Sequence, residues 1–405
     1  MKLFFVLCLN LSFLLRLAAE EIKIEQLKAW FAGDDFPKMS RAARILESEK
    51  YLETLKKWQN EDNTLLAKRA FVLIKRIVKN DDYFLRTLDN IKHVDTEFGL
   101  HQEKIYKYFD WLIKQQNPDG SWGKGNVQAM TAFAVYSLNS QGTSIKEKYK
   151  VALVKGIKWL VNSPLDVIKN HGYPLAVMAC ALGDSYKFYE LEGLEEKLKK
   201  CLQIIIEGQQ DKGAFNYNYS KSGNRQDFHF SSWQYDALFI AKKKGLEIKG
   251  LKEAVDKSIS LLSEIINSEF NFPYTTSNYN FKDLSFSANH NFRGVYNYLS
   301  LKETKKLPEK YMNDLREFNI PREMKDGGRR EMYSIYFFTL NSFLLSMDIK
   351  KHYEMSIASY EKFKQEDGSW MSEFSLSLKD ETDRKIFTSY YAVRILSLPY
   401  HSSYK

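Results

Sequence analysis

Histidine, tyrosine, aspartate and tryptophan side chains recur near the starts of a series of apolar segments, where they could bind a ligand or a metal ion. A histidine ring can coordinate a metal, and it can also donate or accept a hydrogen bond. Three histidines stand at equivalent points of three successive segments. We expect a ligand-binding site built from Thr131, His171, Tyr173, Asp227, His229, Trp233, His290, Tyr333 and Tyr390.

Metal coordination by these histidines is not expected. The axes of packed helices lie about 8–10 Å apart, whereas three ligands must reach one ion at about 2 Å. Helix N-termini instead present free N–H groups that favour anions, and the aromatic members of the set could line an apolar cavity. We therefore predict a site without metal or cofactor that binds an apolar or anionic ligand. Helix capping and plain core packing are the alternative roles of the same residues.

These residues are carried by a repeated pair of predicted helices. Segments 109–122, 204–215 and 360–370 each combine an amphipathic helix with a Gln, an Asp or Gly and an aromatic residue, and weaker copies lie between them. The first helices start near residues 109, 157, 204, 259, 311 and 360, so the period is roughly fifty residues. An apolar second helix follows each, at 131–138, 173–182, 232–240, 292–299, 333–340 and 388–396. Such a period indicates a stacked helical array, and six pairs with buried second helices can close into a double ring.

One motif carries a resemblance to a known family. Residues 116–122 read Gln-x-x-Asp-Gly-Ser-Trp, and Thr-Ala-Phe-Ala-Val follows at 131–135. This pattern resembles the prenyltransferase and squalene-cyclase repeat family, over about residues 105–400. The resemblance implies an all-α (α/α)6 toroid. In particular, the chain is similar to exported bacterial members of that family without established activity.

The chain departs from that family at both of its catalytic sites. The cyclase acid, an Asp-x-Asp-Asp run before Thr-Ala, is replaced here by Val127, Ala129 and Met130 at the acid positions. The Asp-x-Cys of a zinc-dependent protein prenyltransferase is absent, since Met178 stands two residues before Cys180. We therefore expect a non-catalytic, terpenoid-cyclase-like toroid that binds a ligand or an envelope protein. The alternative is a divergent cyclase or prenyltransferase acting on an isoprenoid substrate.

The repeat motif itself has a structural explanation. A side-chain amide can satisfy free backbone groups at a helix end, a glycine permits a tight exit, and an aromatic ring can cover the junction. We predict this structural role, rather than ligand binding, for Gln116, Asp119, Gly120, Trp122, Gln365, Asp367, Gly368 and Trp370.

Residues 1–19 are predicted to be an export signal. Leu3 to Leu15 is apolar apart from Asn10 and Ser12. A helix of this length spans roughly 20 Å, which is short of the bilayer core of about 30 Å. Cleavage after Ala19 would give a periplasmic or extracellular protein, and an uncleaved anchor is the alternative. A helical extension (20–104) and the repeat domain (105–402) follow.

The charge of the chain bears on its partners, and its cysteine content bears on disulfide bonding. The 60 Lys and Arg residues exceed the 51 Asp and Glu residues by nine, and this excess is spread along the chain. A nucleic-acid groove is therefore not expected, whereas weak contact with an anionic membrane surface is an alternative that the charge allows.

Beyond the signal only Cys180 and Cys201 remain, on neighbouring predicted helices. They are interpreted as two core thiols, with one disulfide as the alternative.

Overall fold

The computed structural model divides the chain into two compact units, residues 1–100 and 101–405. The residues that it describes are 24–33, 38, 42–43, 45–46, 48–59, 61, 66–67, 69–70, 73–74, 77, 97–165, 172–186, 188–221, 226–268, 272, 275–276, 288–304, 306–318, 331–345, 347, 349–372 and 378–398. Side-chain surroundings are not described for residues 97–102, 142–144, 226, 275–276, 288–290, 331 and 349–350. The predicted signal therefore lies outside the described residues.

The first unit contains short helices: α2 (Ile24–Ala32), the 3-10 turn η1 (Glu49–Tyr51) and α4 (Leu52–Trp58). The rings of Phe31 and Trp58 pack with their centroids 6.3 Å apart. The buried guanidinium of Arg69 donates to the carbonyl oxygens of Phe31 (2.5 Å) and Gly33 (2.8 Å). These bonds satisfy carbonyl groups that are left free at the end of α2.

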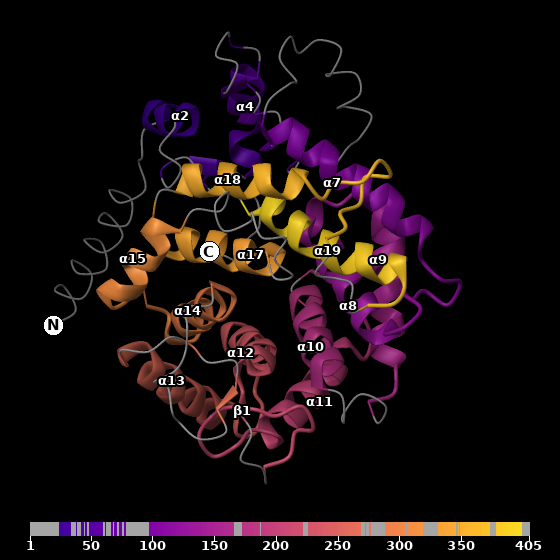
Figure 1. The fold of residues 1–405 in the computed structure, drawn as a ribbon. Coiled ribbons are helices and arrows are strands. Elements are labelled where there is room, and N and C mark those ends of the chain that lie inside the picture. The colour runs from indigo at the N-terminus through magenta and orange to yellow at the C-terminus, as the bar shows by residue number, and fades with distance from the viewer. Residues whose placement is uncertain are drawn as a thin grey trace, which may run out of the picture. The chain divides into compact units, whose positions relative to one another are not determined.

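In the second unit six helices form a closed inner ring (Figure 1). They are α8 (Val127–Leu138), α10 (Gly172–Tyr186), α12 (Phe228–Lys243), α14 (Ala288–Lys302), α17 (Glu331–Leu345) and α19 (Glu381–Ser397). Each packs against the next in this order, and α19 packs against α8, which closes the ring. The inner helices are apolar nearly all round because both of their faces are covered.

A second set of helices precedes the inner helices along the chain. These are α7 (Glu97–Lys114), α9 (Glu147–Asn162), α11 (Leu194–Glu207), α13 (Leu251–Asn267), α15 (Glu309–Glu317) and α18 (Ile349–Glu361). Helix α9 packs on α8 and α10, α13 on α12 and α14, and α18 on α17 and α19. Their apolar residues lie on one face, as in α9, where Leu153, Ile157 and Leu160 are buried and Lys148, Lys155 and Lys158 are exposed. The predicted all-α (α/α)6 toroid is confirmed.

Two short elements complete the described part of this unit. The 3-10 turn η2 (Asn139–Ser144) follows α8. Strands β1 (Gln226–Asp227) and β2 (Thr275–Thr276) pair antiparallel, with Gln226 opposite Thr276 and Asp227 opposite Thr275. This pairing ties together the segments that lead into α12 and α14, at the end of the ring where the inner helices begin. No helix among the described residues has the length and apolar character needed to cross a membrane.

Candidate functional site

Four side chains gather at the end of the ring where the inner helices start, and we call Tyr173, Tyr217, His229 and Tyr333 the mouth site. The ring of His229 lies 5.0 Å from that of Tyr333 and 6.4 Å from that of Tyr173, centroid to centroid. The hydroxyl oxygens of Tyr173 and Tyr217 are 3.4 Å apart. Tyr173, Tyr217 and His229 are half-buried, so aromatic faces and polar atoms both reach the surface here.

Asp227 sets the position of His229. Its carboxylate caps α12 by accepting a hydrogen bond of 2.7 Å from the backbone N–H of Phe230. The hydroxyl of Ser231 donates to the Asp227 carbonyl oxygen at 2.7 Å. Asp227 is fully buried. Asp227, a predicted binding residue, thus stabilises the first turn of α12, which carries His229.

Beneath the mouth site lies a small cavity of about 10 Å³, close to the volume that one ordered water needs. Helices α12, α13 and α14 provide most of its wall. Its lining residues are Phe228, His229, Ser232, Tyr235, Leu262, Phe272, Arg293, Gly294 and Asn297. Eight of these nine are fully buried and His229 is the one that reaches the surface, so the cavity adjoins the mouth site through His229.

Arg293, in the wall of this cavity, belongs to an ion pair with Asp236. The Arg293 guanidinium lies 2.6 Å from the Asp236 carboxylate, and the Asn297 amide donates to the same carboxylate at 2.7 Å. Burial raises the pKa of Asp236 to about 6, although the charge of Arg293 acts in the opposite direction. The guanidinium also lies over the rings of Phe337 (4.0 Å) and Trp233 (4.7 Å). Arg293 thereby links α12, α14 and α17.

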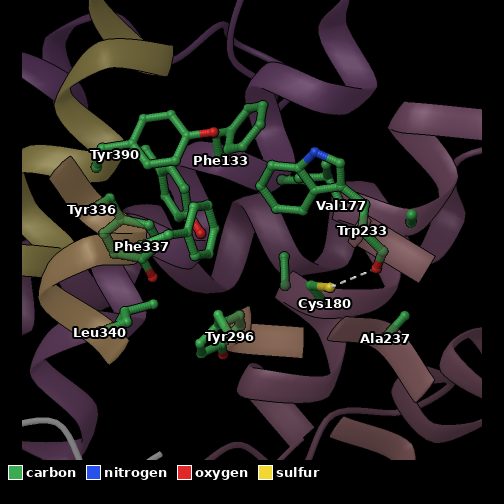
Figure 2. Close-up of a cluster of buried hydrophobic side chains, with 14 of the residues drawn as sticks. Phe133, Val177, Cys180, Trp233, Ala237, Tyr296, Tyr336, Phe337, Leu340 and Tyr390 are labelled. Carbon is green, nitrogen blue, oxygen red and sulfur yellow. Dashed lines mark hydrogen bonds between the residues drawn. The ribbon is translucent and has the colours of Figure 1, made fainter. Parts of the chain in front are cut away.

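The centre of the ring is occupied by aromatic side chains (Figure 2). The ring of Phe133 lies 5.7 Å from that of Trp233 and 5.0 Å from that of Tyr390, and Trp233 and Tyr390 are 6.4 Å apart. These contacts join α8, α12 and α19 across the ring. Trp233 and Tyr390, both predicted binding residues, are therefore part of this core rather than of the mouth site.

Of the three remaining predicted binding residues, Thr131 is the one whose side chain is described. Thr131 is fully buried, and its hydroxyl accepts a hydrogen bond of 2.9 Å from the backbone N–H of Trp122. His171 lies outside the described residues, and His290 belongs to α14 with a side chain that is not described. Of the predicted set, the structure brings together Tyr173, His229 and Tyr333.

The first copy of the repeat motif joins three elements. The Gln116 amide donates to the carbonyl oxygens of Gly120 and Ala152, both at 2.9 Å. Gly120 has φ +95°, and a Cβ there would lie 3.0 Å from the backbone oxygen of Lys155. The Asp119 carboxylate accepts from the backbone N–H (3.0 Å) and hydroxyl (2.7 Å) of Ser121. Trp122 is fully buried and donates its indole N–H to the Leu112 carbonyl oxygen at 2.8 Å.

The second copy repeats this turn. The Asp367 carboxylate accepts from the backbone N–H (2.9 Å) and hydroxyl (2.6 Å) of Ser369, and Gly368 has φ +92°. The Gln365 amide differs, since it donates to the Phe363 carbonyl oxygen at 2.9 Å. Trp370 is fully buried, and its backbone N–H donates to the Ser389 hydroxyl at 2.8 Å. In both copies the motif atoms contact protein groups of the neighbouring turn and helix.

Sequence reasoning missed a feature of the inner helices. In four repeats the backbone N–H of the motif aromatic donates to a side-chain oxygen of the inner helix that follows. The pairs are Trp122 with Thr131, Phe215 with Ser231, Phe272 with Asn291, and Trp370 with Ser389. A hydroxyl or amide at one place in successive apolar helices is the signal that could have revealed it.

Cys180 and Cys201 are separate, buried thiols, so the alternative of a disulfide between them is wrong in this structure. Burial raises the pKa of Cys201 to about 12 and that of Cys180 well above its ordinary value. Because the thiolate is the reactive form, neither is suited to nucleophilic chemistry. No group of three His, Cys, Asp or Glu side chains within the described ranges could hold a metal ion.

The comparisons with known proteins bear on the fold. No family model matches the chain, and no curated protein matches it. Among solved structures it is similar to the GH76A α-1,6-mannanase of Salegentibacter sp. HEL1_6, with a TM-score of 0.52 and 9% identity over 73% of this chain and 98% of that one. An inactive variant with two consecutive aspartates replaced, bound to α-1,6-mannotriose, gives a TM-score of 0.54 and 8% identity over 74% and 99% of the two chains. A second inactive variant, bound to α-1,6-mannotetrose, gives a TM-score of 0.52 and 7% identity over 75% of this chain and 100% of that one.

These likenesses confirm the toroid that the family resemblance implied, and they correct the rest of it. The similar structures are mannanases, not prenyltransferases or squalene cyclases, so the terpenoid-cyclase-like description of the chain is wrong. The isoprenoid substrate of the alternative loses its support for the same reason. The expected apolar or anionic ligand is overturned as well, since the ligands in the similar structures are neutral, hydroxyl-rich oligosaccharides.

Proposed function

We propose that this chain is a glycoside-hydrolase-like toroid whose function is to bind an oligosaccharide at the mouth site. The observation that carries the proposal is the half-buried group of Tyr173, Tyr217 and His229 beside a small cavity that Arg293 and Asn297 help to line. Aromatic faces beside a few placed polar groups are typical of small-ligand sites. Sugars present apolar C–H faces and hydroxyl groups, and this combination complements both features. The toroid shared with mannanases adds support.

We infer binding, rather than cleavage, from the two carboxylates that adjoin the mouth site and the cavity residues, Asp227 and Asp236. Hydrolysis of a glycosidic bond generally needs two carboxyl groups about 5–9.5 Å apart. Residues 101–405 contain no two consecutive aspartates, the residues replaced in the inactive mannanase variants. Asp227 caps α12, and Asp236 is paired with Arg293. These two lie nine residues apart on one helix axis, which corresponds to roughly 13 Å.

The predicted location and domain division become part of the proposal unchanged. The apolar segment 3–15 supports export of the chain, and we propose a periplasmic or extracellular location. The division into a signal (1–19), a helical extension (20–104) and a toroid domain (105–402) is likewise proposed. An oligosaccharide of the cell envelope or its surroundings would then be within reach of the mouth site.

Calorimetric titration of the full chain with α-1,6-mannotriose and α-1,6-mannotetrose tests the proposal. We expect saturable binding that is weakened at least tenfold in Tyr173→Ala. Tyr186→Ala is the matched control, because Tyr186 lies at the opposite end of α10, where its hydroxyl contacts Glu195 at 2.9 Å. Absence of binding to both sugars and to a broad glycan panel would contradict the proposal. Chromatography of the same mixtures after long incubation measures hydrolysis, and released mannose would assign catalysis to this chain.

A further inference from the structure

Two residues that line the cavity beneath His229, Arg293 and Asn297, each carry a buried polar atom without a protein partner among the described residues. Within the described part of the chain, no group pairs with the Nε of Arg293 or the Oδ1 of Asn297. Both side chains are at least 98% buried, with exposed fractions of 2% and 1%, and both line the cavity. An unpaired buried polar atom is unfavourable, so an occupant of the cavity that bonded to both atoms would be favoured.

The size and polarity of the cavity select one chemical group. Its volume of about 10 Å³ admits a single oxygen atom and excludes a sugar ring. A hydroxyl accepts one hydrogen bond and donates another, which matches the Nε donor of Arg293 and the Oδ1 acceptor of Asn297. A carboxylate or phosphate oxygen could use only the donor, and it would add negative charge beside Asp236.

We propose that this cavity is a hydroxyl-recognition pocket of the mouth site that receives the primary hydroxyl of a hexose. The inference rests on the oligosaccharide-binding function proposed above and adds its specificity. The exocyclic CH2OH group projects farther from a hexose ring than the ring hydroxyls do. It can therefore pass His229 while the ring stays among the mouth tyrosines.

The pocket also determines which sugar of a chain is bound. In an α-1,6-linked chain the O6 atom of every sugar except the non-reducing terminal one is part of a linkage. Only the terminal sugar therefore has a free primary hydroxyl to place between Arg293 and Asn297. Mannan chain ends, rather than internal segments, are the ligand class that this geometry recognises.

Two ligands and two variants test the pocket. The ligands are α-1,6-mannotriose and the same trisaccharide with a 6-deoxy non-reducing sugar, titrated into the full chain. Ser232→Thr adds a methyl group at the cavity wall and keeps the hydroxyl that donates to Phe228 at 2.7 Å. Ser359→Thr is the matched control, since the Ser359 hydroxyl donates to Met355 in the same way (2.9 Å) on α18.

We expect the wild type and Ser359→Thr to prefer mannotriose over the deoxy sugar by roughly ten- to a hundredfold, because the deoxy sugar leaves the polar atoms unpaired. Ser232→Thr should lose most of this preference. Equal affinity of the wild type for both sugars would overturn the pocket, and would mean that it holds an ordered water only, while leaving oligosaccharide binding in place. Failure of both sugars and the glycan panel to bind would instead remove the proposed function itself.

Discussion

Replacing Trp122 by alanine should show how strongly the first repeat motif stabilises the toroid. The side chain is fully buried, it packs against Gly156 of α9, and its indole N–H donates to the Leu112 carbonyl oxygen at 2.8 Å. Truncating a buried tryptophan costs about 3–5 kcal/mol, since apolar contact is lost and a cavity remains. For a unit of this size, at roughly 2 °C per kcal/mol, the Tm should fall by about 6–10 °C.

The assay is thermal unfolding followed by circular dichroism at 222 nm, with two comparison variants. Trp122→Phe keeps most of the ring and removes the indole N–H, so about 1–2 kcal/mol should be lost. Trp159→Ala is the matched control, because Trp159 is only half-buried and its indole contacts Asp119 at 2.9 Å near the surface. If Trp122→Ala lowers the Tm no more than Trp159→Ala does, the conclusion that Trp122 stabilises the core is wrong.

Three further perturbations address the ion pair, the thiols and the mouth site. Folding raises the pKa of Asp236 from 3.8 to about 6, so the folded state loses stability as pH rises from about 4 through 6 and the carboxyl group ionises. Asn cannot ionise. The free energy of unfolding of Asp236→Asn, relative to that of the wild type, should therefore rise by about 3 kcal/mol between pH 4 and 7.5. A pH-independent Tm difference would contradict this. Thiol titration of the unfolded, unreduced protein without its signal should find both Cys180 and Cys201 free, and a count near zero would show a bond between them. His229→Ala should weaken α-1,6-mannotriose binding at least tenfold with an unchanged far-ultraviolet spectrum, and unchanged affinity would exclude His229 from the site.

The ring architecture was predictable because it repeats. A period of roughly fifty residues, an amphipathic first helix and an apolar second helix all follow from local pattern, and each is present in the structure. The same pattern placed Tyr173, His229 and Tyr333 together, since each stands near the start of an inner helix. It could not separate residues facing the mouth from Trp233, because the direction of a side chain depends on helix rotation. It also misplaced Tyr390, because α19 begins at Glu381, nine residues before it.

The family resemblance gave the correct fold and the wrong chemistry for a physical reason. Gly120 has φ +95°, Asp119 holds the turn through Ser121, and Trp122 fills the core. The motif therefore reports how a helix pair is joined in this toroid, and one fold can carry different activities. The Asp236–Arg293 pair was missed because residues 57 positions apart show no relation in a single sequence.

Ring closure at Asp383 constrains how the polypeptide is made. Both carboxylate oxygens accept backbone N–H groups of the segment before α8, from Lys124 and Gly125 at 2.9 Å each, across 259 and 258 residues of sequence. Contacts between such distant residues form slowly, because the intervening loop must first be ordered. A ribosome-bound chain has synthesised α8 long before α19 emerges, so the apolar flank of α8 stays uncovered until translation is almost complete. Late nonsense or frameshift mutations should therefore yield aggregation-prone, chaperone-bound products rather than a slightly shortened ring.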